Sequence, residues 1–179
     1  MKKVFLIAFL FTGISLHAQT FTLKSSDLGG QAVEKQVLDG FGCKGKNLSP
    51  QIYWENAPSG TKSFAVTIFD ESAPTSSGWW HWLIFDIPLN TTELKSGAGT
   101  VTLNLAPNGS IQSITDFKSQ CYSGPCPPEG SKPHKYVVTV YALKTEKLGL
   151  DASANPALVS FMLEQNLIEK SSLIFYYKR

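Results

Sequence analysis

The sequence predicts a mainly β fold, an antiparallel β-sandwich with a few peripheral helices. About eight short segments have the composition and periodicity of strands, and one late segment has convincing helical spacing. Strands and helices do not alternate along the chain, which argues against a parallel α/β sheet. The chain has the size of a single domain, which we place at residues 19–179.

Residues 1–18 have the pattern of a secretory signal peptide. Met1–Lys3 is basic, Val4–Leu16 is mostly apolar, and Ala18 supplies a small residue before the expected cut. The apolar run is short for a membrane span, so we expect cleavage and no integral membrane segment afterwards, with an uncleaved anchor as the alternative. The predicted location is the periplasm or the extracellular space.

The charge balance excludes some classes of partner. Removal of the signal peptide removes two lysines and no acids, which leaves 14 basic and 14 acidic residues. A neutral chain without a basic cluster argues against nucleic acid and anionic membrane surfaces as main partners.

The first part of the chain contains short strands and one long loop. Thr20–Leu23 and Val33–Leu38 are predicted as strands, and Gln51–Glu55 as another. Between them, Asp39–Pro50 is predicted as a loop because it is rich in glycine and contains asparagine and proline.

Two stronger strand signals follow. Lys62–Asp70 alternates regularly, which places Asp70 at the end of an otherwise apolar face. Trp80–Ile87 is apolar on both faces and is predicted as a central strand, in which alternation puts His81 on the face of Leu83.

The second half contains a weak strand, two clear strands and the helix. Thr100–Leu105 is the weak strand, Lys135–Leu143 alternates again, and Leu173–Tyr177 is the last strand. Asn155 is a good helix N-cap, and Pro156 suits the first helical position. The residues that follow at helical spacing are Leu158, Phe161, Met162, Gln165 and Ile168.

An acid and two histidines form the candidate site. His81 and His134 each lie where a loop enters a strand, and Asp70 lies where a strand ends. Imidazoles can donate hydrogen bonds to an anion, and an acid can orient an imidazole through its other nitrogen. Singly, each residue also fits an ordinary role, as a turn cap or a core histidine. Together they favour a site for a small anion that binds more strongly as pH falls through about 6.5.

Other chemistries have weaker support. Two histidines and one carboxylate match the ligand count of some metal sites, but no local histidine spacing supports one, so no metal or cofactor is expected. No Gly-x-Ser-x-Gly elbow is present, which argues against a serine hydrolase. Cys121 as a nucleophile beside His134 is the remaining catalytic alternative, and we expect a protein that is not an enzyme.

Three cysteines leave one unpaired in any intramolecular scheme. A Cys43–Cys126 bridge closes a loop of about 84 residues, worth about 4.5 kcal/mol in the chain-entropy model, against about 2 kcal/mol for the short loop of Cys121–Cys126. The short loop also contains a Gly-Pro pair, whose restricted backbone hinders bridging. We therefore expect Cys43–Cys126, with Cys121 free, and keep Cys121–Cys126 as the alternative.

Several ordered motifs resemble the phosphatidylethanolamine-binding protein family, also called Raf-kinase-inhibitor-like proteins, and in particular its exported bacterial branch. They lie in residues 42–50, 70–74, 78–82 and 124–136. The resemblance implies a β-sandwich with a small pocket for phosphate or phosphorylated head groups, such as phosphatidylethanolamine-like ligands. Carried over by motif, the pocket residues are Asp70, Pro74, Trp79 and His81 on one wall, and Tyr122, Gly124, Pro128, His134 and Tyr136 on the other.

One motif departs from the family pattern. The family's Asp-Pro-Asp-x-Pro is replaced by Asp-Glu-Ser-Ala-Pro, so Ser72 stands where a second acid is usual. The function that the resemblance implies is an exported, non-catalytic binding protein for a small anion. The alternative is a secreted inhibitor or modulator of a protein partner, such as a peptidase, acting through its surface. A homodimer is compatible with both.

Overall fold

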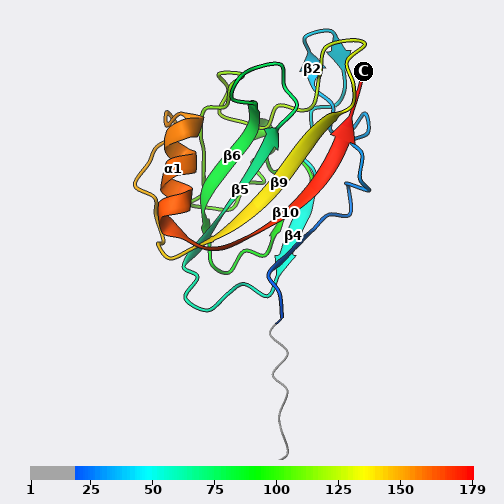
Figure 1. Ribbon diagram of the computed structural model, residues 1–179. Helices are drawn as coiled ribbons and strands as arrows, with labels where there is room; N and C mark the ends of the chain where they lie inside the picture. The colour runs from blue at the N-terminus through cyan, green and yellow to red at the C-terminus, as the bar shows by residue number, and fades with distance from the viewer. Residues whose placement is uncertain (1–18) are drawn as a thin grey trace, which may run out of the picture.

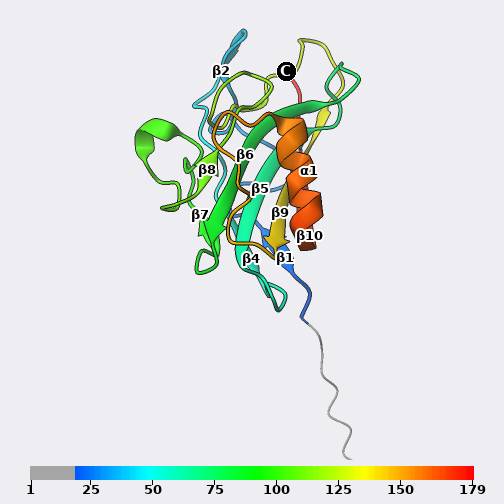
Figure 2. The same cartoon turned by 90° about the vertical axis from the view of Figure 1, so that its left-hand side faces the viewer.

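The structure is a computed structural model that describes residues 19–179, so the signal peptide predicted at residues 1–18 lies outside the described residues. Its main feature is a twisted antiparallel sheet in the order β10-β9-β5-β6-β8. Figures 1 and 2 show helix α1 against one face of this sheet and strands β1 and β4 behind the other. The five strands are β5 (Ser63–Asp70), β6 (Trp79–Pro88), β8 (Ile111–Gln112), β9 (His134–Leu143) and β10 (Leu167–Tyr177).

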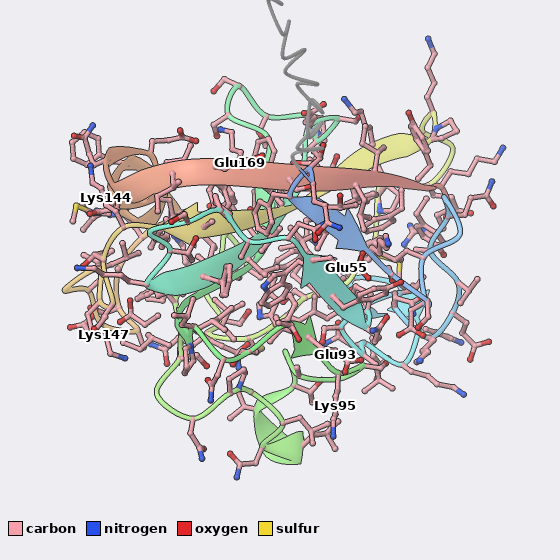
Figure 3. The ribbon with its side chains drawn as sticks, turned by 90° about the horizontal axis from the view of Figure 1, so that it is seen from below. Glu55, Glu93, Lys95, Lys144, Lys147 and Glu169 are labelled. Atoms are coloured by element: carbon pink, nitrogen blue, oxygen red, sulfur yellow. A yellow bond between two sulfur atoms is a disulfide. The ribbon has the colours of Figure 1, made fainter. Side chains whose placement is uncertain are left out.

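A second, smaller sheet completes the sandwich. It is formed by β1 (Thr22–Lys24), β4 (Ile52–Glu55) and β7 (Glu93–Leu94) in the order β1-β4-β7. Its Trp54 packs against Phe64 of the large sheet, with ring centroids 5.1 Å apart. In Figure 3 the labelled charged side chains lie around the outside of these layers, at the end of the molecule away from the pocket described below. The predicted antiparallel β-sandwich is confirmed.

Two apolar cores lie on the two faces of the large sheet. Alternate residues of β5 explain the division, because Phe64, Val66 and Ile68 face the small sheet, whereas Ala65 faces α1. The predicted strands at Lys62–Asp70 and Lys135–Leu143 are confirmed as β5 and β9. Both are buried on both faces over most of their length, as expected of strands between two apolar layers.

Two predicted strands are wrong. Val33–Leu38 forms turns, in which the backbone N–H of Gln36 donates to the Val33 carbonyl at 2.9 Å. Thr100–Leu105 contains instead the short 3₁₀-helix η1 (Val101–Leu103), whose side chains are exposed. In the first segment the carbonyls of Glu34, Lys35 and Val37 accept hydrogen bonds from the loop at residues 46–48. Both segments have β-branched residues, but strand propensity is overridden by the tertiary context.

The predicted loop at residues 39–50 holds a small hairpin of β2 (Asp39–Gly40) and β3 (Cys43–Lys44). Phe41 and Gly42 form its turn with φ angles of 52° and 84°. Two consecutive positive φ angles are characteristic of the tight turns that join antiparallel strands. This hairpin lies near the C-terminus in Figure 1, beside the candidate site.

Helix α1 (Pro156–Asn166) begins as predicted, and the Asn155 side chain accepts a hydrogen bond from the Leu158 backbone N–H at 3.0 Å. The predicted apolar face is wrong. Phe161 is 58% exposed, and the residues buried against the sheet are Pro156, Val159 and Leu163. Apolar side chains surround this helix, so helical spacing alone does not identify the buried face.

Strand β10 follows α1 directly at Leu167, so the last strand begins six residues before the predicted start at Leu173. The unpredicted part contains Glu169 and Lys170, which are exposed at the edge of the sheet and give no apolar alternation. Across residues 19–179, no helix has both the length and the apolar character needed to cross a membrane.

Candidate functional site

The site is built on one row of residues across three strands. Asp70 is the last residue of β5, and it pairs with Trp79 of β6 on one side and Tyr136 of β9 on the other. Side chains alternate along each strand, so this pairing fixes which residues turn toward the small sheet. Asp70 ends the face of Phe64, Val66 and Ile68, as predicted, but it borders a pocket instead of the core.

His81 reaches the same pocket through a β-bulge, and its predicted facing with Leu83 is wrong. The β5–β6 register shifts where Ile68 pairs with Trp82 and Phe69 pairs with Trp80, which leaves His81 as the extra residue. Leu83 lies in the core under α1, whereas the His81 ring lies 5.2 Å from the ring of Tyr136 on the opposite face. Bulges commonly redirect a side chain in this way next to functional sites.

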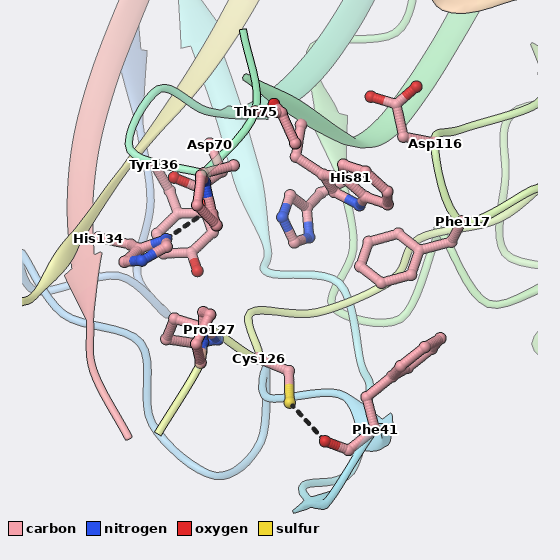
Figure 4. A pocket seen from close by; sticks show the side chains of 14 residues that line it. Phe41, Asp70, Thr75, His81, Asp116, Phe117, Cys126, Pro127, His134 and Tyr136 are labelled. Atoms are coloured by element: carbon pink, nitrogen blue, oxygen red, sulfur yellow. Dashed lines mark hydrogen bonds and ion pairs between the residues drawn. The ribbon is translucent and has the colours of Figure 1, made fainter. Parts of the chain in front are cut away.

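The pocket has a volume of about 430 Å³. Figure 4 shows His81 and His134 on opposite sides of it, with Tyr136 and Asp70 beside His134 and Pro127 below. Seven of the nine residues assigned to the site by resemblance line it: Asp70, Pro74, Trp79, His81, Pro128, His134 and Tyr136. The other lining residues are Phe41, Ala73, Thr75, Asp116, Phe117, Cys126 and Pro127.

His134 is oriented by Asp70. Its Nδ1 lies 2.7 Å from Asp70 Oδ2, and both side chains are buried, with exposures of 6% and 3%. The other carboxylate oxygen, Oδ1, accepts the backbone N–H of Ser72 at 2.8 Å. An ionised carboxylate only accepts, so His134 Nδ1 carries the proton of this bond and Nε2 is left for a ligand.

His81 has a different partner. Its Nδ1 lies 2.6 Å from the backbone carbonyl oxygen of Ser123, and its side chain is only 3% exposed. Because a carbonyl oxygen cannot donate, Nδ1 must carry the hydrogen. Burial lowers the pKa of His81, and the opposing effects of the Ser123 carbonyl and the Asp70 charge are smaller. His81 is therefore neutral under conditions in which an ordinary histidine would be partly protonated.

Two hydrogen-bond donors at the pocket lack partners within the described residues. They are the hydroxyl of Tyr136 and the indole N–H of Trp79, and both atoms are buried. Figure 4 shows the Tyr136 hydroxyl pointing into the space between the two imidazoles. Burial, followed by the nearby charge of Asp70, raises the pKa of Tyr136, so the phenol keeps its proton. Buried donors without partners are uncommon, and a ligand in the pocket would satisfy this one.

The sequence did not identify the aromatic residues at the pocket mouth. Phe41 lies at the tip of the β2–β3 turn, is 82% exposed, and its ring centroid is 5.9 Å from that of Phe117. Phe117 also lies 5.1 Å from His81. The adjacent Asp116 lines the pocket and accepts the backbone N–H of Trp80 through Oδ2 at 2.8 Å. The only signal in the sequence was a phenylalanine between two glycines in a loop. Loop sequence alone does not place this residue beside Phe117.

Tyr122 and Gly124 are not among the residues that line the pocket, unlike the other seven assigned by resemblance. Tyr122 is buried behind it, and its hydroxyl donates to the Gln36 carbonyl at 2.9 Å. Gly124 donates its N–H to Asn47 Oδ1 at 2.8 Å, and an added Cβ would lie 2.0 Å from the Gln36 carbonyl oxygen. Both therefore support the segment that carries Ser123, the partner of His81, without facing a ligand.

The predicted Cys43–Cys126 disulfide is present, and Cys121 is a free thiol. The bridge ties the β2–β3 hairpin to the segment that forms the pocket floor, because Cys126 lines the pocket and Cys43 belongs to β3. Arg179 strengthens this connection, since its Nη1 donates to the Phe41 carbonyl at 3.1 Å.

The side chain of Ser72, which replaces the second acid of the family motif, is turned away from the pocket. Its Oγ accepts the backbone N–H of Lys135 at 3.0 Å. Ser72 thus fastens the loop after β5 to β9. Within residues 19–179, no group of three His, Cys, Asp or Glu side chains is arranged to hold a metal ion.

Comparisons with known proteins agree with this architecture. Residues 29–178 match the family model described as phosphatidylethanolamine-binding protein. The chain is 42% identical over 170 residues to YbcL of Escherichia coli strain K12, covering 94% of this chain and 93% of YbcL. It is 39% identical over 153 residues to YbhB of the same organism, covering 84% and 96%.

Solved structures give the same result. The crystal structure of E. coli YbcL, described as a new member of the mammalian PEBP family, matches with a TM-score of 0.86 and 43% identity, covering 89% of this chain and 98% of that one. A homolog from Chlamydia trachomatis has the same fold, with a TM-score of 0.73 and 21% identity, over 89% and 97% of the two chains. The chain therefore belongs to the phosphatidylethanolamine-binding protein family.

Proposed function

We propose that this family member is an exported, non-catalytic binding protein whose pocket takes phosphate or a phosphorylated head group. The observation that carries the proposal is the convergence of His81, His134 and the unpaired Tyr136 hydroxyl on one pocket. These groups provide both hydrogen-bond donors and hydrogen-bond acceptors around a small oxyanion. The apolar remainder of a larger ligand would contact Phe41 and Phe117 at the mouth.

The side chains of the pocket that could act as nucleophiles have surroundings that favour binding over catalysis. The Thr75 hydroxyl donates to the Gly78 carbonyl at 2.6 Å, and Cys126 is held in the disulfide. The raised pKa of Tyr136 keeps its hydroxyl protonated. A hydroxyl held by a carbonyl and a sulfur held in a disulfide are not activated as nucleophiles.

Affinity should be modest for the smallest ligand. Each hydrogen bond to a charged oxygen contributes roughly 1.5 to 3 kcal/mol, but ordering and desolvation offset part of this. A bare phosphate should therefore bind with a Kd on the order of 1 mM, and phosphoethanolamine more tightly if it reaches the aromatic mouth.

Titration by NMR or calorimetry with phosphate and phosphoethanolamine tests the proposal. Tyr136→Phe and His134→Gln should each weaken binding, because each removes a group that faces the ligand. Glu93→Gln, at a surface position distant from the pocket, is the matched control and should bind as the unmodified protein does. Equal binding by all variants, or no binding at all, would contradict the pocket and favour a protein partner at the surface.

Export needs a separate test, because it is proposed from the sequence of residues 1–18 and not from the pocket. In these residues a basic start is followed by an apolar run and a small residue. N-terminal sequencing of material released from the periplasm or collected from the medium should find a chain that begins at Gln19. An intact Met1 in a membrane fraction would contradict cleavage.

A further inference from the structure

We infer that the pocket binds its phosphate group with one proton attached, and that this P–OH donates a hydrogen bond to Nε2 of His81. The site then accepts free phosphate and phosphate monoesters, and it discriminates against phosphodiesters and sulfate. This inference rests on the proposed function and narrows it, because a free phosphorylated head group is a monoester whereas the same group within an intact phospholipid is a diester.

The first step is the fixed orientation of His81. The 2.6 Å contact of Nδ1 with the Ser123 carbonyl requires the hydrogen to lie on Nδ1. In the neutral ring, Nε2 is then an acceptor. Nε2 makes no hydrogen bond within the described residues, and it is not among their buried unpaired polar atoms. Because His81 lines the pocket, this nitrogen is available to a ligand there.

The second step is the charge state of this ring. The groups around it are Asp70 of β5, Tyr136 and His134 of β9, and Asp116 and Phe117 of the loop after β8. The two carboxylates favour the protonated ring, but burial outweighs them and lowers the pKa of His81. The acceptor form therefore prevails near neutral pH, which corrects the expectation that both imidazoles attract the anion as cations.

The third step is complementarity. Tyr136 offers a donor without a partner, so it suits a charged phosphate oxygen. His81 offers an acceptor, so it suits an oxygen that carries hydrogen. A phosphate monoester has a second pKa of about 6, and its monoanion has both kinds of oxygen. A diester and sulfate have no such hydrogen near neutral pH, and each would place a charged oxygen against the lone pair of Nε2.

A buried polar group that a ligand leaves unpaired is costly, and binding sites use this cost to discriminate between ligands that differ by one hydrogen. We expect the protonated phosphate monoester to bind about tenfold or more tightly than a diester or sulfate, equivalent to about 1.4 kcal/mol.

The number of protons taken up on binding gives a second signature. Above about pH 7 the monoester is mostly a dianion, so binding in the proposed form takes up one proton onto a ligand oxygen.

The experiment is calorimetry on the full mature chain with two matched pairs, methyl phosphate against dimethyl phosphate, and phosphate against sulfate. Each titration is repeated at about pH 5.5 and about pH 7.5, on either side of the phosphate pKa, in buffers of different ionisation enthalpy. At about pH 5.5, where the monoanion predominates, the first member of each pair should bind about tenfold or more tightly. This preference should shrink at about pH 7.5, because the dianion must first take up a proton. Methyl phosphate should take up about one proton at the higher pH and almost none at the lower pH.

Two variants assign these effects to His81. The amide of His81→Gln both donates and accepts, so the preference should fall to within about threefold and proton uptake should largely disappear. Tyr136→Phe should weaken both members of a pair and preserve their ratio. Dimethyl phosphate is the control for proton uptake by the protein itself, because it has no oxygen that takes up a proton near neutral pH.

The outcomes are distinguishable. Two results would overturn the inference and leave the proposed function intact. One is equal binding of methyl phosphate and dimethyl phosphate by the unmodified protein at about pH 5.5, and the other is tight binding of methyl phosphate without proton uptake at about pH 7.5. Failure of all four compounds to bind would contradict the proposed function itself, and the inference with it. The comparison of ligands on the unmodified protein keeps the test decisive even if a variant fails to fold.

Discussion

Asp70 Oδ2 and His134 Nδ1 are separated by 64 residues in the chain and by 2.7 Å in space. The contact joins the end of β5 to the start of β9, and both partners are almost fully buried. A buried carboxylate and imidazole are stable together only while each satisfies the other. The pair is therefore part of the fold as well as of the pocket.

Asp70→Ala should lower the free energy of unfolding by roughly 1 to 3 kcal/mol, because it leaves His134 Nδ1 and the Ser72 N–H without partners. Glu71→Ala removes the neighbouring acid, whose ion pair with Lys135 is largely exposed, and should cost less than about 1 kcal/mol. Urea denaturation near neutral pH measures both values. Equal losses in the two variants would contradict a structural role for the Asp70–His134 pair.

Stability should decrease as pH falls below the ordinary histidine range. The pKa of His81 is lowered in the folded protein, whereas in the unfolded chain it is near 6.5. Below that pH the unfolded chain binds more protons at this position, so acid favours unfolding, and the contribution is restored as pH rises above about 6.5. His81→Gln should show a shallower loss in urea titrations carried out across this range. Parallel pH profiles for the two proteins would show that His81 titrates as it does in the unfolded chain.

Removal of the Cys43–Cys126 disulfide should destabilise the protein by about 2 to 5 kcal/mol, since the bridge closes about half of residues 19–179 into a loop. The double variant Cys43→Ser, Cys126→Ser should also bind phosphate more weakly, because the hairpin that carries Phe41 loses its tether to the pocket floor. Cys121→Ser is the matched control and should change stability little, because Cys121 is unpaired. Peptide mapping under non-reducing conditions verifies the pairing, and a Cys121–Cys126 peptide would refute it.

Truncation of two apolar side chains on α1 should reduce the stability of the protein by very different amounts. Leu163→Ala should cost about 2 to 5 kcal/mol because its side chain is buried against the sheet. Phe161→Ala removes a larger side chain but should cost less than about 1 kcal/mol, since more than half of it is exposed. Thermal denaturation of the two variants gives the comparison. A larger loss for Phe161→Ala would mean that the helix is rotated relative to the structure described above.

The predictable parts of the fold were those in which one signal dominates. In β5 and β9 the run of apolar residues predicts a strand, and its period of two assigns side chains to the two faces. Asn155-Pro156 has a local capping mechanism that needs no tertiary information. Val33–Leu38 was predicted wrongly because its β-branched residues favour a strand, whereas its carbonyls form hydrogen bonds with the loop at residues 46–48. Helix α1 has apolar residues all around, so its buried face is decided by the position of the sheet.

In the candidate site, too, residues placed by a local pattern were predicted correctly, and those placed by contacts with another segment were not. Asp70 was placed by alternation, since β5 keeps its side-chain alternation up to its last residue. His81 was assigned to the wrong face because a bulge is an extra residue in the pairing with another strand, and one strand's sequence does not reveal it. The nearness of Phe41 to Phe117 depends on a disulfide and a loop contact across the chain, which no local pattern encodes.

The row Trp79–Asp70–Tyr136 has a kinetic consequence. The Asp70–Trp79 pair closes a short hairpin, whereas the Asp70–Tyr136 pair must wait until the chain from β6 through β8 has been brought back to β5. Closure of so long a segment is slow, and the pocket exists only after it. A ligand should therefore leave the refolding rate unchanged and slow unfolding, since the interactions it makes are absent from the transition state.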